Sequence, residues 1–495
     1  MIELRTRIIK FLDSKKQFPI IAAVAAGLYP LLFYYNTNFT LVNSWTQFAF
    51  FLACYIVIPI IIFIISYALF KKFDKGGKYI SYVIPVLNFT AFTYFVILST
   101  YGFKNKWLFL FLLAVFFLAI LIKNHINKII VFQFLLALFV FIKLLPDFHK
   151  VATYSATWQE QPDNIEDVIF KKKPNIYIIQ PDGYANFSEL KKGYYSYNNS
   201  SFENFLKDEN FKLYNNYRSN YGSTLSSNSS MFSMKHHYYN NTTTSSKELY
   251  NTREIIVGDN PVISILKKNN YKNFLLLERP YLLVNRPKVG YDYCNIDFSE
   301  ISFLARGFEI EKEVISELEH AITENVSTNN FYFIGLMRPS HISVNKNESK
   351  GIKKERETYL KDLEKANKSL KEILKIIKEK DTNSLIAIVA DHGGFIGLNY
   401  SMETHVKQTE RDIIYSIYTS ALAIKWPDSV PSFDVKLNTS VNLFRVLFSY
   451  LSENESYLNY LEKDKSFALI KEDAPYGVYE YIDENGNTIF NKYKE

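Results

Sequence analysis

Two acidic residues each follow a short apolar run, at the point where a buried strand would end. Asp182 follows residues 176–181, and Asp391 follows residues 386–390 and is itself followed by His392. A carboxylate oxygen beside an imidazole nitrogen is a ligand pair that suits Zn²⁺ or Mn²⁺. Glycine comes next in both motifs and allows close approach of the backbone. Taken alone, Asp391 and His392 are also compatible with a strand-to-turn cap and a surface histidine.

A hydroxyl-rich segment lies between these two acids in the chain. It begins with Gly222, Ser223 and Thr224 and continues through residues 225–233, which indicates a glycine turn followed by a helix start. A hydroxyl at a helix N-terminus is stabilised by the helix dipole and the free amides. A metal bound to that oxygen lowers its pKa and makes it a nucleophile. A serine-rich N-cap without catalytic function is the alternative interpretation.

The elements that must position these residues are predicted from periodicity. Short apolar runs predict strands over residues 175–180, 273–277, 331–336, 385–390 and 417–424. Amphipathic spacing predicts helices over residues 201–208, 261–268, 307–324, 355–380 and 439–452. Alternation of the two indicates an α/β/α sandwich with a mostly parallel sheet. Ligands bind beyond the carboxyl ends of such strands, which is where Asp182 and Asp391 are expected.

The first part of the chain has a different character. Residues 1–150 contain fifteen lysines or arginines and only four acids. Five apolar stretches occur there, over residues 18–35, 48–70, 79–103, 107–122 and 129–145. A crossing helix needs about 20 apolar residues. We therefore expect an α-helical membrane domain with five spans over residues 1–150, a juxtamembrane linker over residues 151–173, and an extracytoplasmic domain over residues 174–495.

Charge in the short loops predicts the orientation. Loops on alternate sides carry eleven and two basic residues, so the N-terminus is expected to be cytoplasmic. Five crossings would then bring the chain out of the membrane near residue 150 on the opposite side, in the periplasm or cell-surface space. The spans contain almost no charge in their middles, which favours an anchor over a transport path.

Composition excludes several other classes of protein. The sequence pI of about 8.8 is not a nucleic-acid signal, because the positive charge belongs to the apolar segment, and no nucleic-acid partner is expected. The apolar content of 48% excludes global disorder. Only two cysteines are present, Cys54 and Cys294, and Cys54 lies in an apolar run, so a disulfide-built scaffold is excluded as well.

The order of the motifs resembles a known superfamily. The chain contains, in this order, a strand ending in Asp, a Gly-x-Thr helix start, an isolated His, a strand ending in Asp-His-Gly and a late His. This order is similar to that of the alkaline phosphatase/sulfatase superfamily. With the five predicted spans, the chain more narrowly resembles its membrane-anchored phosphotransferase branch, the lipoteichoic acid synthases and lipid A phosphoethanolamine transferases. The resemblance implies an alkaline phosphatase-like, sulfatase-like domain that covers the chain after the linker.

The resemblance also implies a set of site residues. One divalent metal, Zn or Mn, would be held by four ligands, namely Asp182, Thr224, Asp391 and His392. Thr224 would be the nucleophile, and Ser223 remains its rival. His341 would contact the phosphate and His405 would protonate the leaving oxygen. An ordinary loop histidine is the alternative interpretation of each.

The function implied is a metal-dependent phosphotransferase. It would move a phosphoryl headgroup, such as phosphoethanolamine or phosphoglycerol, from a phospholipid donor to an envelope glycan or glycolipid acceptor, and we expect it to act as a monomer. The alternatives are a sulfatase-like hydrolase of phosphodiesters or sulfate esters and an inactive binding domain. Residues 223–227 lack the Pro/Ala and Arg of the formylglycine motif, which argues against a formylglycine sulfatase. The phosphoethanolamine enzymes carry several disulfides and this domain has a single cysteine, which leaves the headgroup open. Asp182 in place of the usual Glu would alter the metal preference without removing the site.

Overall fold

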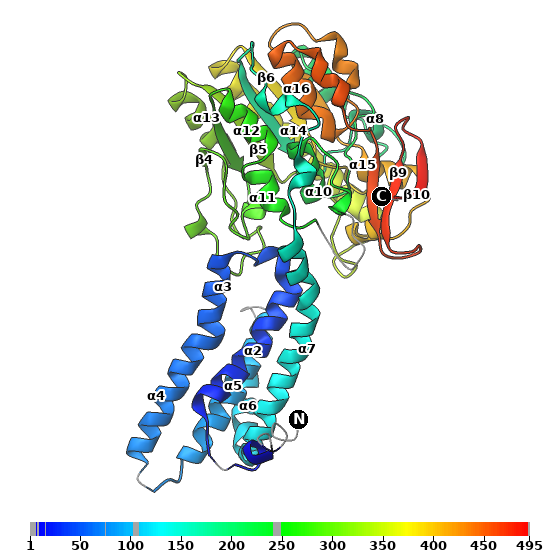
Figure 1. The fold of residues 1–495 in the computed structure, drawn as a ribbon. Coiled ribbons are helices and arrows are strands. Elements are labelled where there is room, and N and C mark those ends of the chain that lie inside the picture. Colours follow the sequence, from blue (N-terminus) through cyan, green and yellow to red (C-terminus); the bar gives the residue numbers. More distant parts are fainter. Residues whose placement is uncertain are drawn as a thin grey trace. The chain divides into compact units, whose positions relative to one another are not determined.

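The computed structural model describes residues 6, 9–14, 16–74, 76–101, 108–240 and 249–493. The chain divides into two compact units, Met1–Tyr154 and Ser155–Glu495, which are described separately (Figure 1). Some of the basic residues used to predict the orientation lie outside the described residues, namely Arg5, Arg7, Lys15, Lys75, Lys104 and Lys106. The same holds for residues 102–103 at the end of the third predicted span and Trp107 at the start of the fourth.

The first unit is built from apolar helices. Its main elements are α2 (Pro19–Asn38), α3 (Trp45–Leu52), α4 (Ile58–Phe73), α5 (Ile80–Tyr101), α6 (Leu108–Leu121) and α7 (Ile126–Thr153). Four helical stretches in the described residues are long and apolar enough to cross a membrane: Pro19–Leu41, Trp45–Phe73, Ile80–Thr100 and Lys123–Thr153. The fifth, α6, has 14 described residues and is shorter than a crossing requires. Four of the five predicted spans are thus confirmed in length and composition, and the fifth stays a prediction.

A buried polar contact joins three of these helices. The amides of Asn88 and Gln133 donate to each other's oxygens over 2.9 and 3.0 Å, and Asn88 also donates to the Ala22 carbonyl at 2.7 Å. Both side chains are buried. Hydrogen bonds of this kind hold helices together in an apolar medium, so the contact agrees with a structural anchor.

A seven-stranded sheet forms the centre of the second unit. Its strands are β1 (Asn175–Pro181), β2 (Lys212–Leu213), β3 (Tyr271–Leu277), β4 (Tyr293–Cys294), β5 (Asn329–Leu336), β6 (Ser384–Val389) and β7 (Leu422–Lys425). The strand order is β2-β7-β6-β1-β5-β3-β4. β1 pairs in parallel with β5 and β6, and β3 in parallel with β5 and β4, whereas β7 runs antiparallel to its two neighbours. The sheet is therefore mixed and mostly parallel.

Both faces of this sheet are covered by helices. Alternate residues of each strand point to opposite faces, so Ile178 and Phe333 belong to one core and Tyr177 and Tyr332 to the other. The first core is completed by α10 (Thr224–Ser233), α11 (Thr252–Val257), α12 (Pro261–Lys268) and α16 (Leu443–Ser452). The second is completed by α13 (Val314–Glu324), α14 (Ile352–Lys380) and α15 (Arg411–Tyr418), with α8 (Phe187–Leu190) and α9 (Ser200–Asp208). The predicted α/β/α layering is confirmed.

Three predicted element boundaries are wrong. The strand expected over residues 417–424 is divided, because Ile417 and Tyr418 end α15 and the strand β7 begins only at Leu422. The helix expected over residues 307–324 begins at Val314, where the Glu313 side chain accepts from the amides of Ile315 and Ser316 and caps it. The helix expected over residues 439–452 begins at Leu443, after the short 3₁₀ turn Ser440–Asn442.

Two further features were not predicted. A second, antiparallel sheet of β8 (Ser466–Ile470), β9 (Gly477–Ile482) and β10 (Thr488–Lys492) lies near the C-terminus (Figure 1). In addition, the segment predicted as a juxtamembrane linker is in large part packed onto the second unit. Its Ile165, Val168 and Phe170 are buried in the core that contains α10.

Candidate metal centre

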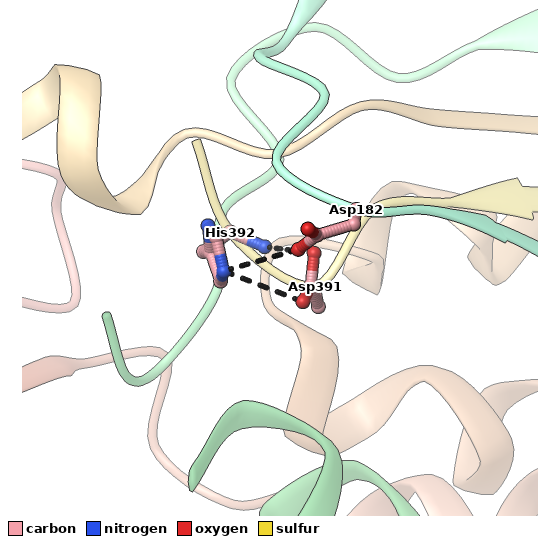
Figure 2. A group of neighbouring side chains, drawn as sticks. All are labelled: Asp182, Asp391 and His392. Atoms are coloured by element: carbon pink, nitrogen blue, oxygen red, sulfur yellow. Dashed lines mark hydrogen bonds and ion pairs between the residues drawn. The ribbon is translucent and has the colours of Figure 1, made fainter. Parts of the chain in front are cut away.

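Four polar side chains meet where two neighbouring strands end and the helix α10 begins. Asp182 directly follows β1, and Asp391 and His392 follow β6, which pairs with β1. His392 Nε2 lies 3.4 Å from Asp182 Oδ1 and 3.4 Å from Asp391 Oδ2, and Figure 2 shows its ring beside both carboxylates. Thr224 Oγ1 lies 3.3 Å from His392 Nε2 and 3.4 Å from Asp182 Oδ1. The four predicted ligands are therefore close together.

Backbone groups fix the orientation of Asp391 and His392. Asp391 Oδ1 accepts from the amides of Gly183 and His392, both at 3.0 Å. His392 Nδ1 lies 2.8 Å from the Gly393 carbonyl, and because a carbonyl can only accept, Nδ1 carries the proton. The lone pair of the neutral ring is then on Nε2, which faces the two carboxylates. An imidazole whose other nitrogen donates to the backbone is the usual arrangement of a metal ligand.

Gly183 makes the close contact between the two strand ends possible. Its φ of +66° is a left-handed conformation that side chains rarely adopt, and a Cβ there would collide with the Ser340 carbonyl. The turn brings its amide to Asp391 while Ser340 N donates to the Asp182 carbonyl at 2.8 Å. The glycine after the first acid is thus needed for both loops to meet.

The helix α10 begins at the cluster and distinguishes the two candidate hydroxyls. Ser223 is the N-cap, and its hydroxyl accepts from the Ser226 amide at 3.4 Å and donates to Ser226 Oγ at 3.0 Å. Thr224 is the first residue of the helix, and its hydroxyl faces Asp182 and His392. Ser223 is exposed and Thr224 is half-buried. Only Thr224 of the pair lies among the carboxylates and the imidazole.

An amide pair that sequence analysis missed holds α10 against the sheet. Gln180 Nε2 donates to Asn228 Oδ1 at 2.8 Å, and Asn228 Nδ2 donates to Gln180 Oε1 at 2.7 Å. Both side chains are buried. Gln180 stands two residues before Asp182 and Asn228 one helical turn after Thr224, so the pair fixes the distance between the nucleophile candidate and the first acid.

The cluster forms one wall of a cavity of about 510 Å³. His341, in the loop after β5, and His405 line the same cavity. His341 Nδ1 donates to the Ile342 carbonyl at 2.7 Å and His405 Nδ1 donates to the Leu469 carbonyl at 2.9 Å, so in both rings Nε2 is the remaining nitrogen. Burial and the neighbouring His392 lower the pKa of His341 to about 4. Burial and Lys471 lower the pKa of His405 as well.

Sequence reasoning missed several other residues of this cavity. They come from loops far apart in the chain, so their only common signal is spatial: Tyr281, Phe308, Met337, Ser340, Val344, Met402 and Lys471.

The electrostatics of the cluster fit a divalent cation. Burial, together with the nearby Asp391 carboxylate, raises the pKa of Asp182 well above its ordinary value. Asp391 Oδ2 is buried and has no hydrogen-bond partner among the described residues. Ligand atoms of Asp182, Asp391 and His392 all lie within 4.8 Å of one another. A bound cation would neutralise the charge of the two buried acids and would accept the imidazole lone pair. Two carboxylates and one imidazole form a donor set that suits Zn²⁺ or Mn²⁺.

Comparison with known proteins shows similarity in structure but not in sequence. No protein-family model and no curated protein matches the chain. Part of the chain is nevertheless similar in fold to solved domains of phosphoethanolamine transferases and to sulfatases.

Three solved structures illustrate this similarity. The C-terminal periplasmic domain of EcEptC from Escherichia coli, in complex with Zn, is 11% identical over 64% of this chain and 96% of that chain, with a TM-score of 0.42. The soluble domain of lipooligosaccharide phosphoethanolamine transferase A from Neisseria meningitidis is 13% identical over 58% and 92%, with a TM-score of 0.38. The putative sulfatase yidJ from Bacteroides fragilis is 11% identical over 60% and 81%, with a TM-score of 0.40.

Proposed function

We propose that the chain is a membrane-anchored phosphotransferase that depends on a divalent metal, Zn²⁺ or Mn²⁺, and uses Thr224 as its nucleophile. The observation that supports this most strongly is the position of Thr224 Oγ1, 3.3 Å from His392 Nε2 and 3.4 Å from Asp182 Oδ1 at the start of α10. Asp182, Asp391, His392 and Thr224 would hold the metal. When bound, the metal supplies a Lewis acid that lowers the pKa of a hydroxyl and neutralises charge on a phosphoryl oxygen.

The chain's own residues would carry out two displacements. Thr224 Oγ1 loses its proton to solvent and attacks the phosphorus of a phosphodiester, and the bond from phosphorus to the leaving oxygen breaks. A protonated His405 gives its proton to the leaving oxygen, so that an alcohol departs and a phosphothreonine diester remains. An acceptor hydroxyl then attacks the same phosphorus and gives its proton to His405, the bond from phosphorus to Thr224 Oγ1 breaks, and Thr224 takes a proton back from solvent. His341 contacts the phosphoryl oxygens, which fits its place beside His392 with ring centroids 5.7 Å apart.

The rim of the cavity supports a phospholipid as the donor. Phe308, Val344 and Met402 line the cavity and remain 50%, 43% and 45% exposed, although their side chains are apolar. An apolar rim beside a polar centre is suited to an amphiphile whose headgroup enters while its glyceride part stays outside. A phosphoethanolamine or phosphoglycerol headgroup would be passed to an envelope glycan or glycolipid, and diacylglycerol would leave.

The test of this function compares two substrates with the full chain in detergent. We expect cleavage of both a soluble chromogenic phosphodiester and a fluorescent phospholipid, with EDTA abolishing both and Zn²⁺ or Mn²⁺ restoring them. Phe308→Ser and Met402→Ser should lower phospholipid turnover about 10-fold, since apolar contact area is lost, and leave the soluble substrate within about 2-fold. Val435→Ser is the matched control, because Val435 is 72% exposed and is not among the cavity residues. Equal losses on both substrates would contradict a lipid-binding rim.

The location proposed is a bacterial inner (cell) membrane, with the N-terminus cytoplasmic and the catalytic domain periplasmic or extracellular. This topology requires α6 to be a fifth crossing, since four crossings would return the chain to the cytoplasm. Protease added to intact spheroplasts should therefore digest the second unit while an N-terminal epitope tag survives. Protection of the second unit until the membrane is permeabilised would contradict the fifth crossing.

A further inference from the structure

The helix that begins with Thr224 is linked to the segment that follows α7 in the chain at both ends, at one end through His237 and at the other directly. This segment, residues 155–170, is here called the collar (Figure 1). At the first turn of α10, the ring of Trp158 meets the ring of His237 edge-on, with centroids 5.9 Å apart. His237 Nε2 in turn donates to the carbonyl of Ser226 at 3.0 Å. At the other end, Gln161 Nε2 donates to the carbonyl of Ser233, the last residue of α10, at 2.8 Å.

The hydrogen bonds of His237 fix its ring in one state. Its Nδ1 accepts from the Tyr239 amide at 2.8 Å while its Nε2 donates to Ser226, so both nitrogens are satisfied in the neutral form. The ring also stacks on Tyr221, with centroids 3.9 Å apart. Tyr221 stands three residues before Thr224, so the His237 ring supports both the loop that leads into α10 and the first turn of the helix.

The collar itself is held by a buried cation from α16. Arg445 is 1% exposed and donates to Gln161 Oε1 at 2.7 Å and to Asp163 Oδ2 at 2.8 Å. A charge buried in this way is stable only with its partners in place, so the position of Gln161 is strongly determined. The carbonyl of Ser233 has no partner within the helix, because it belongs to the last turn, and Gln161 satisfies it.

We infer that the collar positions the nucleophile helix: Trp158, through His237, and Gln161 hold the two ends of α10 so that Thr224 stays within reach of Asp182 and His392. This inference rests on the proposed function for its effect on turnover, but the restraint on α10 can be observed without it. Trp158 and Gln161 are not among the described residues that line the cavity or form the cluster, so they are positioning residues. Displacement of a nucleophile by about 1 Å costs on the order of 100-fold in rate.

The experiment uses the full chain in detergent with Trp158→Ala and Gln161→Ala. We expect kcat on the soluble phosphodiester to fall about 10-fold to 100-fold, with KM and bound metal unchanged. Trp158→Phe should restore kcat to within about 3-fold, because it keeps an aromatic edge against His237. Phe170→Ala is the matched control: it removes a buried ring from the same collar, but its aromatic partners, Tyr271 and Phe448, lie outside α10. It should lower Tm and leave kcat near that of the wild type.

Hydrogen–deuterium exchange provides a measurement that does not depend on activity. Trp158→Ala and Gln161→Ala should accelerate exchange of the amides of residues 226–233, and Phe170→Ala should not. If the wild type cleaves no phosphodiester, the proposed function has failed and exchange alone decides the role of the collar. Unchanged exchange in α10, or equal changes in all three variants, would overturn the inference.

Discussion

Replacing Thr224 with alanine is expected to reduce turnover of a phosphodiester by about 1,000-fold or more, while the protein stays folded and retains its metal. Its hydroxyl is the only one of the two candidates that faces the carboxylates and the imidazole. Removal of that oxygen takes away the atom that forms the covalent intermediate, whereas Asp182, Asp391 and His392 remain to hold the cation. The measurements are steady-state turnover, elemental analysis and thermal melting of the purified full chain.

Two neighbouring variants make this prediction specific. Ser223→Ala should lower stability by about 1 kcal/mol through loss of the N-cap and leave turnover within a few-fold of the wild type. Thr224→Ser keeps an oxygen at the same position and should retain measurable activity. Mass spectrometry of the wild type after acid quenching should find the phosphoryl headgroup on the peptide that contains Thr224. Activity lost in Ser223→Ala and kept in Thr224→Ala would transfer the nucleophile to Ser223.

The cluster was predictable from sequence because each of its parts has a local signal. Asp182 and Asp391 each follow an apolar run short enough to be a buried strand, and parallel strands end at the same edge of a sheet. The glycine before Ser223 and the hydroxyls after it mark a helix start. Local patterns of this kind survive into the fold, since strand ends and helix caps are decided by a few neighbouring residues.

The features that were missed depend on pairing between distant segments. Gln180 and Asn228 are 48 positions apart, and neither has a pattern that indicates its partner. The division of residues 417–424 between α15 and β7 was also missed. Ile417, Tyr418 and Ala421 are all buried in the same core, and a short apolar run of this kind is compatible with the end of a helix as well as with a strand. The sequence of the collar predicted a linker because most of its residues are polar. Its apolar residues Ile165, Val168 and Phe170 nevertheless pack into the core.

Asp391→Asn is expected to weaken metal binding by about 100-fold or more. Changing a residue that only hydrogen-bonds to a metal ligand already weakens binding by about 10-fold to 100-fold, and Asp391 is proposed to be a ligand itself. The substituted side chain is nearly the same size, and its remaining oxygen can still accept from the amides of Gly183 and His392. What is lost is the negative charge and the Oδ2 atom that lies 3.4 Å from His392 Nε2. Elemental analysis of the purified full chain should find about one metal in the wild type and little in the variant, with turnover lost in parallel.

The stability of the metal-free protein gives the matching control. Asp391 faces another buried acid, Asp182, so removing one of the two charges should leave the metal-free melting temperature unchanged or raise it. Asp434 is equally buried, but it accepts from Tyr214 and forms an ion pair with Lys212, so Asp434→Asn should lower the melting temperature and leave the metal content intact. A buried carboxylate at a metal site is stabilised by the cation, whereas a structural one is stabilised by the protein. If Asp391→Asn behaved like Asp434→Asn in both measurements, the cluster would be a structural polar contact and the metal centre would be rejected.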